Sequence, residues 1–160
     1  METIEFSVDS TYNIAVDGLG SIIYDKWYSR KGHVTAGSSQ YVLQQRGFWG
    51  THHELLQNNM PVYETKMSFW GKLTITPIKA AHHFYTITYK GFKGYRLLNY
   101  KGEEVATLGS DMRRKGWKTI YTLNTVDGFT ATDEGKLLSL LLIRQYRGAQ
   151  QATVAAATTS

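Results

Sequence analysis

Short stretches in which apolar and polar residues alternate follow one another along most of the chain, separated by turn residues. Alternation with a period of two places the apolar side chains on one face of a strand, so the pattern predicts an all-β protein. Asp17-Gly18, Asn58-Asn59 and Lys101-Gly102 have the composition of tight hairpin turns. We expect about twelve strands, at residues 3–8, 12–16, 21–27, 32–35, 41–46, 51–57, 61–66, 70–76, 83–90, 94–98, 103–108 and 117–124.

The pattern changes near the C-terminus, where a helix is predicted. Thr132 or Asp133 can cap its first turn, and Glu134 adds a favourable acidic residue there. Apolar residues then cover nearly the whole helix circumference, at Leu137, Leu138, Leu140, Leu141, Leu142 and Ile143. Such a helix must be buried on all sides, and it is too short to span a membrane. We expect it to cover residues 133–147 and to stop at Gly148, and the low-complexity tail 148–160 is a candidate for disorder.

The simplest way to bury this helix is to wrap the sheet around it. Closing the sheet into a barrel also removes the free edges on which other chains could pair. The expected fold class is therefore all-β with one buried helix, a closed antiparallel barrel of about twelve strands around a hydrophobic C-terminal α-helix. A chain of 160 residues fits one such domain, and we assign residues 1–147 to it.

One turn sequence occurs twice, as RGFWG at residues 46–50 and as KGFKG at residues 90–94. The two copies continue in parallel, because Leu55-Leu56 lies near the place that Leu97-Leu98 takes in the second copy. Both copies fall between predicted strands and not between a strand and a helix, as a phosphate-binding loop would. We interpret them as a repeated strand-turn-strand unit whose glycines serve the backbone geometry of the turn.

Three sets of four strands followed by a buried apolar helix resemble the tubby C-terminal-like superfamily, which includes the tubby domain, the LURP-one-related proteins and the phospholipid scramblases. The resemblance depends on the two repeated turns, on LLNYKGEEVATL after the second turn and on LLSLLLIRQY in the helix. It covers roughly residues 3–147 and implies a closed twelve-stranded barrel threaded by its C-terminal helix. The chain is much shorter than a tubby domain, and none of that domain's phosphoinositide-binding residues can be mapped onto it.

Positive charge is concentrated in one part of the chain. Between residues 90 and 118 there are eight Lys and Arg against three acidic residues, an excess equal to the whole net charge of +5. Aromatic residues are interleaved with these cations, a mixture that suits an anionic membrane surface. The candidate lipid-binding or anion-binding residues are Lys90, Lys93, Arg96, Arg113, Arg114, Lys115 and Lys118.

Within this set, the triplet at residues 113–115 is expected in a loop and is the densest positive point. The aromatic pairs Phe48-Trp49 and Phe69-Trp70 are the second candidates. For these pairs we expect one ring to point outward and the other to pack inside the barrel. A solvated outer strand face, with the aromatic residues turned inward, would explain the basic stretch equally well.

Little in the sequence indicates catalysis. The chain has no Cys, which excludes disulfides, a thiol nucleophile and cysteine-ligated metal, and no nucleophile elbow, phosphate loop or dinucleotide fingerprint is present. The pairs His52-His53 and His82-His83 are poor chelators, because neighbouring residues of a strand point to opposite faces. We therefore expect no enzyme activity, no cofactor and no metal.

The leading hypothesis is a non-enzymatic binding module for anionic membrane lipid or for a membrane-associated partner. The first alternative is a barrel that binds a small molecule or lipid in an interior cavity, with the helix outside or displaced. The second alternative is a nucleic-acid-binding β domain. The N-terminal residues lack the apolar region of a signal peptide, so we expect a cytoplasmic protein, peripheral to the membrane if it binds lipid. Ligand identity and oligomeric state are not predicted.

Overall fold

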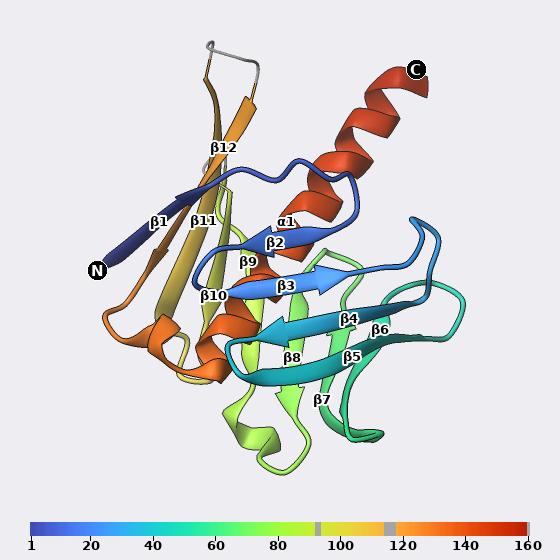
Figure 1. The fold of residues 1–160 in the computed structure, drawn as a ribbon, viewed down its shortest axis with the longest axis vertical. Helices are drawn as coiled ribbons and strands as arrows, with labels where there is room; N and C mark the ends of the chain where they lie inside the picture. The colour runs from blue at the N-terminus through green and yellow to red at the C-terminus, as the bar shows by residue number, and fades with distance from the viewer. Residues whose placement is uncertain (92–93, 114–117, 160) are drawn as a thin grey trace.

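The computed structural model describes residues 1–91, 94–113 and 118–159 and shows a twelve-stranded antiparallel sheet curled around one long helix (Figure 1). The 3-10 helix η1 (Ala81–His83) lies just before strand β9 (Tyr85–Tyr89). The 3-10 helix η3 (Phe129–Ala131) lies just before the long helix α1 (Asp133–Thr159). The strands are β1 (Glu2–Phe6), β2 (Ile14–Val16), β3 (Gly20–Ile23), β4 (Lys31–Ala36), β5 (Ser39–Arg46), β6 (His52–Gln57), β7 (Met60–Met67), β8 (Leu73–Pro77), β9 (Tyr85–Tyr89), β10 (Tyr95–Leu98), β11 (Glu104–Arg113) and β12 (Lys118–Thr125).

The sheet is a meander in which each strand from β2 to β12 pairs with the next one along the chain, and β1 pairs with β12. Successive connections of a meander lie at alternate ends of the barrel. The connections β3–β4, β5–β6 and β7–β8 therefore share one end, which we call the rim end, with the C-terminal half of α1 (Figure 1). The opposite end, the base end, holds the start of α1.

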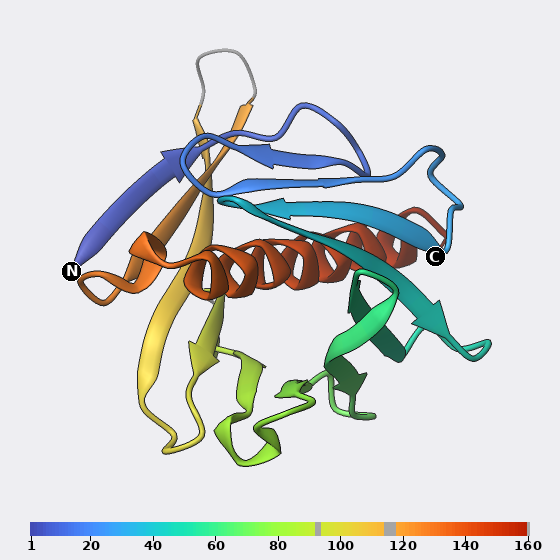
Figure 2. The same ribbon diagram turned by 60° about the horizontal axis from the view of Figure 1, so that its bottom comes forward.

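The helix runs through the middle of the barrel, as Figure 2 shows. It contacts β3 and β4 on one side and β10 and β11 on another. Its six central apolar residues, Leu137 to Ile143 without Ser139, are at most 2% exposed. At the base end, Asp133 accepts hydrogen bonds from Ser38 Oγ (2.8 Å) and Ser39 Oγ (2.6 Å), which fix the first turn against the β4–β5 turn. The predicted fold class is thus confirmed, except that the barrel is nearly and not completely closed.

One side of the barrel is not closed by strand pairing. β1 and β2 are the two ends of the sheet, and a groove of about 850 Å³ lies along them and the Asp17-Gly18 turn. The link between these strands crosses the rim end, where the Arg147 guanidinium and the Gln151 side-chain amide donate to backbone carbonyls of residues 10, 11 and 13. The helix therefore fixes the β1–β2 link across the gap where these two strands do not pair.

Several predicted boundaries are shifted, and the two largest errors are at the ends of α1 and β11. α1 continues through Gly148 to Thr159, because Gly148 keeps a negative φ and the Ala-rich sequence that follows has high helix propensity. β11 continues past Leu108 to Arg113, so Arg113 lies on a strand, paired with Lys118, and not in a loop. The predicted cap is confirmed, since Thr132 Oγ1 accepts a hydrogen bond from the Gly135 amide at 3.0 Å.

The repeated unit predicted from the sequence is present in the backbone. β6 and β10, which follow the two copies of the turn, each carry a register shift at the corresponding place, between Leu55 and Leu56 and between Leu97 and Leu98. The glycines of both copies have positive φ, as expected for their role in the turn. The copies differ at the last glycine, because a Cβ on Gly94 would lie 2.0 Å from the Leu108 carbonyl oxygen, whereas one on Gly50 would meet only the Gln45 side chain at 3.9 Å.

This difference predicts unequal effects of the same substitution. Gly50→Ala strains only the backbone and should cost about 1–2 kcal/mol of unfolding free energy. Gly94→Ala adds a clash with a neighbouring strand and should cost at least about 3 kcal/mol. Urea unfolding of both variants measures the difference, and equal losses would contradict the predicted backbone contact at Gly94.

The buried helix predicts a strong position dependence for an added charge. Leu141→Asp places a carboxylate among apolar side chains and should lower the unfolding free energy by more than about 4 kcal/mol. Ala152→Asp, on an exposed position of the same helix, should change it by less than about 1 kcal/mol. Circular dichroism during urea unfolding is the measurement. A stably folded Leu141→Asp protein would show that the helix is not the core of the barrel.

Candidate functional site

Three successive hairpin loops at the rim end carry large aromatic side chains that protrude into solvent. In the β5–β6 loop Phe48 is 91% and Trp49 89% exposed, and in the β7–β8 loop Phe69 is 94% and Trp70 88% exposed. Trp27 in the β3–β4 loop is 77% exposed. We call these loops the aromatic rim, formed by Trp27, Tyr28, Phe48, Trp49, Phe69 and Trp70. It contains three of the four Trp residues of the chain.

The expectation that one ring of each pair packs inside the barrel is wrong. Both pairs lie in loops beyond the strand ends, where the inward-outward alternation of a strand does not apply. The sequence Phe-Trp-Gly occupies both loops, at 48–50 and at 69–71, and the glycine that follows each Trp has positive φ. Phe69 and Trp70 pack edge-to-face on each other, with ring centroids 5.4 Å apart, and not on the barrel.

The rim loops are held in place by hydrogen bonds and are not open chain. The Ser68 amide donates to the Lys72 carbonyl oxygen at 2.8 Å, and the Gly71 amide donates to the Ser68 carbonyl oxygen at 3.0 Å, which closes the β7–β8 loop into a tight turn. The Arg30 guanidinium of the β3–β4 loop donates to the Gly47 carbonyl oxygen of the β5–β6 loop. The rings are therefore presented by ordered turns.

Inside the rim lies a groove of about 540 Å³, which we call the mouth groove. Its walls come from the rim loops, at Trp27, Gly50 and Gly71, and from the helix, at Arg144 and Arg147. The same groove includes the link between β1 and β2. Segments that are far apart in the sequence thus converge around the helix where it leaves the barrel.

Arg144 is the partly buried cation of this groove. Its Nε donates to the Tyr24 hydroxyl at 2.9 Å, and its Nη2 lies 3.3 Å from Nε2 of His53. His53 is 8% exposed, and burial, with the charge of Arg144 as the second cause, lowers its pKa to about 4. The ring is therefore neutral near pH 7 and accepts the hydrogen bond through Nε2, which leaves its proton on Nδ1.

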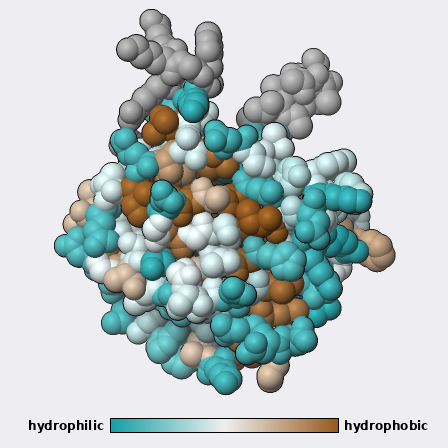
Figure 3. All heavy atoms as spheres, in the orientation of Figure 1, coloured by the Kyte–Doolittle hydropathy of each residue, from teal (hydrophilic) through white to brown (hydrophobic). Residues whose placement is uncertain are grey.

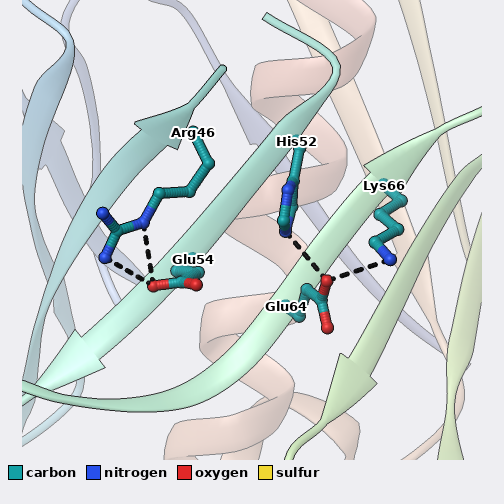
Figure 4. A network of polar contacts seen from close by, with 5 residues as sticks. All are labelled: Arg46, His52, Glu54, Glu64 and Lys66. Carbon is teal, nitrogen blue, oxygen red and sulfur yellow. Dashed lines mark hydrogen bonds and ion pairs between the residues drawn. The ribbon is translucent and has the colours of Figure 1, made fainter.

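Cations on the outer face of the strands, unlike Arg144, are paired with carboxylates (Figure 4). Arg46 donates twice to Glu54 Oε2, at 2.9 and 3.1 Å. Glu64 Oε1 pairs with Lys66 Nζ at 3.2 Å and lies 2.8 Å from His52 Nε2, which is not aligned for a hydrogen bond. Arg46 and Lys66 therefore each have a carboxylate partner and are not free to bind an outside anion.

The structure describes the side chains of only three of the predicted basic residues, so the predicted site stays a prediction. Lys90 Nζ pairs with Glu104 at 2.9 Å, Arg96 Nε donates to Thr88 Oγ1 at 3.1 Å, and Lys118 is exposed on β12. Three members of the predicted set, Lys93, Arg114 and Lys115, lie outside the described residues, as does the side chain of Arg113.

Sequence reasoning missed the residues that do converge at the rim end, namely Trp27, Tyr24, His53 and Arg144. For Arg144 a signal was present, since it is the first cation after the apolar run of the helix. The pairing of Arg144 with His53 and Tyr24 joins residues 91 and 120 positions apart and has no local signal.

The remaining histidines form no chelating group. His82 and His83 lie in η1 at the base end, with ring centroids 4.0 Å apart, and His83 stacks on Tyr100. Among the residues that the structure describes, no three His, Asp or Glu side chains are placed to hold a metal ion. No helix in the described part of the chain has both the length and the apolar character to cross a membrane.

The fold and the rim together define a helix-filled antiparallel β-barrel with a projecting aromatic end. Comparisons with models of known protein families, with curated proteins and with solved structures found no match. What the chain does must therefore be inferred from its own geometry.

The environment of His53 predicts a pH dependence of stability. Its pKa is about 4 in the folded protein against 6.5 in the unfolded chain, so the unfolded chain binds the proton first as the pH falls. The stabilisation is complete above about pH 6.5 and is lost as the pH falls toward about 4. We expect the unfolding free energy to drop by about 2 kcal/mol between about pH 7 and pH 5 for this reason.

Urea titrations over this pH range measure the effect. His53→Gln keeps an acceptor near Arg144 and should remove most of the pH dependence. His33→Gln changes an exposed residue of β4 and serves as the matched control, with the wild-type slope. An unchanged slope in the His53→Gln protein would contradict the assignment.

Proposed function

We propose that the chain is a non-enzymatic module that binds the interfacial region of a lipid membrane through its aromatic rim. The observation that carries this proposal is the exposure of Trp27, Trp49 and Trp70, at 77%, 89% and 88%, on three successive loops at one end of the barrel. Burying one such ring contributes roughly 2 kcal/mol, so a surface that displays several of them favours an apolar partner.

A membrane fits the chemistry of this surface. Trp is enriched at the boundary between headgroups and acyl chains, where its ring is in apolar surroundings and its N–H remains hydrated. The same loops carry the exposed cations Lys26, Arg30 and Lys72, with Asp25 as an acidic neighbour. Lys26 Nζ lies 5.5 Å from the Tyr28 ring centroid, so charge and ring are presented together. Cations beside interfacial rings are attracted to anionic phospholipid.

The shape of the surface also favours a membrane over a protein partner. The rings lie on separate loop tips around the mouth of the barrel, so several can enter a fluid interface at once. The face drawn in Figure 3, which carries β1 to β5, shows hydrophobic atoms in separate patches among hydrophilic ones.

The alternatives have less support. The interior of the barrel is filled by α1, whose apolar residues are at most 2% exposed, so an interior ligand would have to displace the core. No arrangement in the described residues favours nucleic acid over lipid. Kinship with the tubby C-terminal-like superfamily is part of the proposal, and the twelve-stranded barrel around a C-terminal helix supports it.

Co-sedimentation with lipid vesicles tests the proposal. The protein should bind vesicles that contain phosphatidylglycerol more tightly than vesicles of phosphatidylcholine alone, and salt should weaken the difference. Trp49→Ala and Trp70→Ala should each weaken binding by about tenfold, since each removes one buried ring from the interface.

Tyr100→Ala is the matched control, because Tyr100 is 43% exposed but lies at the base end. It should bind as the wild type does. Bromine-labelled lipids should quench the rim tryptophans in the wild-type protein. Absence of vesicle binding, or equal losses in the Trp49→Ala and Tyr100→Ala proteins, would refute the membrane role of the rim.

A further inference from the structure

The mouth groove contains a cation, Arg144, for which the described residues supply no opposite charge. Arg144 is partly buried, and the residues on either side of it in the sequence, Ile143 and Gln145, are uncharged. Among the described residues, which include every Asp and Glu of the chain, no carboxylate lies within ion-pair distance of Arg144. Its two hydrogen-bond partners are the hydroxyl of Tyr24 and the neutral ring of His53. Other partly exposed cations of this barrel, such as Arg46 and Lys90, have carboxylate partners.

Withdrawing a cation from water without a counter-charge is unfavourable, so such an arrangement needs a compensating ligand or a cost in stability. The guanidinium has five N–H donors in a planar fork, and the two hydrogen bonds just described use two of them. The side chain lines the groove and therefore faces a space that a ligand can enter.

The position of Arg144 is set by its neighbours. Tyr24, which accepts from Nε, is itself held by a hydrogen bond from its backbone amide to Asn13 Oδ1 at 2.7 Å. One turn further along the helix, Arg147 Nη1 donates to the Asn13 carbonyl oxygen at 3.3 Å and brings a second positive charge to the same groove. A fork that is oriented before binding loses little conformational entropy when it takes up a planar or tetrahedral oxyanion.

We propose that the mouth groove is a binding site for the phosphate of an anionic phospholipid headgroup, held by Arg144 with Arg147 beside it. This inference rests on the proposed membrane function, because the headgroup belongs to the lipid that the aromatic rim contacts. The groove volume of about 540 Å³ exceeds what a phosphate needs and is suited to a headgroup. Trp27, Gly50 and Gly71 border it, so rings that enter the interface bring the groove to headgroup depth.

A charge-conserving substitution separates this site from general surface attraction. Arg144→Lys keeps the net charge but removes the fork, and it should weaken binding to phosphatidylglycerol vesicles by about tenfold. Arg46→Lys makes the same change at an exposed arginine that pairs with Glu54 outside the groove, and it should bind within about twofold of the wild type. Both are measured by co-sedimentation at matched salt.

The outcomes distinguish the two proposals. If the wild-type protein does not bind phosphatidylglycerol vesicles, the membrane function itself fails. If the wild type binds and Arg144→Lys binds equally well, the membrane function stands and the phosphate site is refuted. If glycerol phosphate, which has no acyl chains, prevents vesicle binding at the concentration of the vesicle lipid, the site takes a soluble phosphate compound and its assignment to lipid is overturned.

A measurement on the wild-type protein covers the case in which Arg144→Lys does not fold. Dihexanoyl phosphatidylglycerol, kept below its micelle concentration, should shift the Arg144 Nε–H resonance and the His53 ring resonances in nuclear magnetic resonance spectra. His33 lies on the outer face of β4 and should show no shift. Unchanged Arg144 and His53 signals at a lipid concentration that shifts the rim tryptophans would overturn the assignment.

Discussion

An apolar surface that covers the whole circumference of a helix can be removed from water only if protein surrounds the helix on every side. In this chain the requirement is met by a sheet that contacts α1 from opposite walls and by polar contacts at both ends of the helix. At the base end, Glu134 accepts hydrogen bonds from the hydroxyls of Tyr63 at 2.7 Å and Tyr85 at 3.0 Å. Burial and the carboxylate both raise the pKa of these tyrosines, to about 12 for Tyr85, so each stays a donor. The sheet buries the helix, and the helix in turn fills the interior of the barrel, so neither is stable without the other.

The same requirement explains why the architecture could be read from the sequence. A strand period of two, turn residues such as Asn58-Asn59 with positive φ, and the unbroken run of leucines are local signals, and local signals define strands, turns and the buried helix. The helix end was misjudged because Gly148 can terminate a helix or continue one, and the sequence that follows decides which.

The candidate site was harder to predict, for two physical reasons. The rim rings were expected to obey strand alternation, but they lie on loops, where exposure is set by turn geometry and not by a period. Within the described part of the chain Arg144 has no carboxylate partner because the fold keeps acidic side chains away from it, and an absence of this kind can be seen only in three dimensions. Net charge along the sequence therefore pointed to the stretch 90–118, whereas Arg144 is noticeable only once its partners in the fold are known.

The pairing of β1 with β12 also affects the order in which the protein can assemble. Glu2 lies opposite Thr125, so β1 cannot pair until β12, the last strand of the sheet, has been synthesised. Every other strand pair joins neighbours in the chain and can form as a local hairpin soon after synthesis. The helix follows β12, so the core itself arrives only after the whole sheet has been made. Until then the inward face of the meander has nothing to cover it, which makes the growing chain dependent on rapid completion or on chaperones.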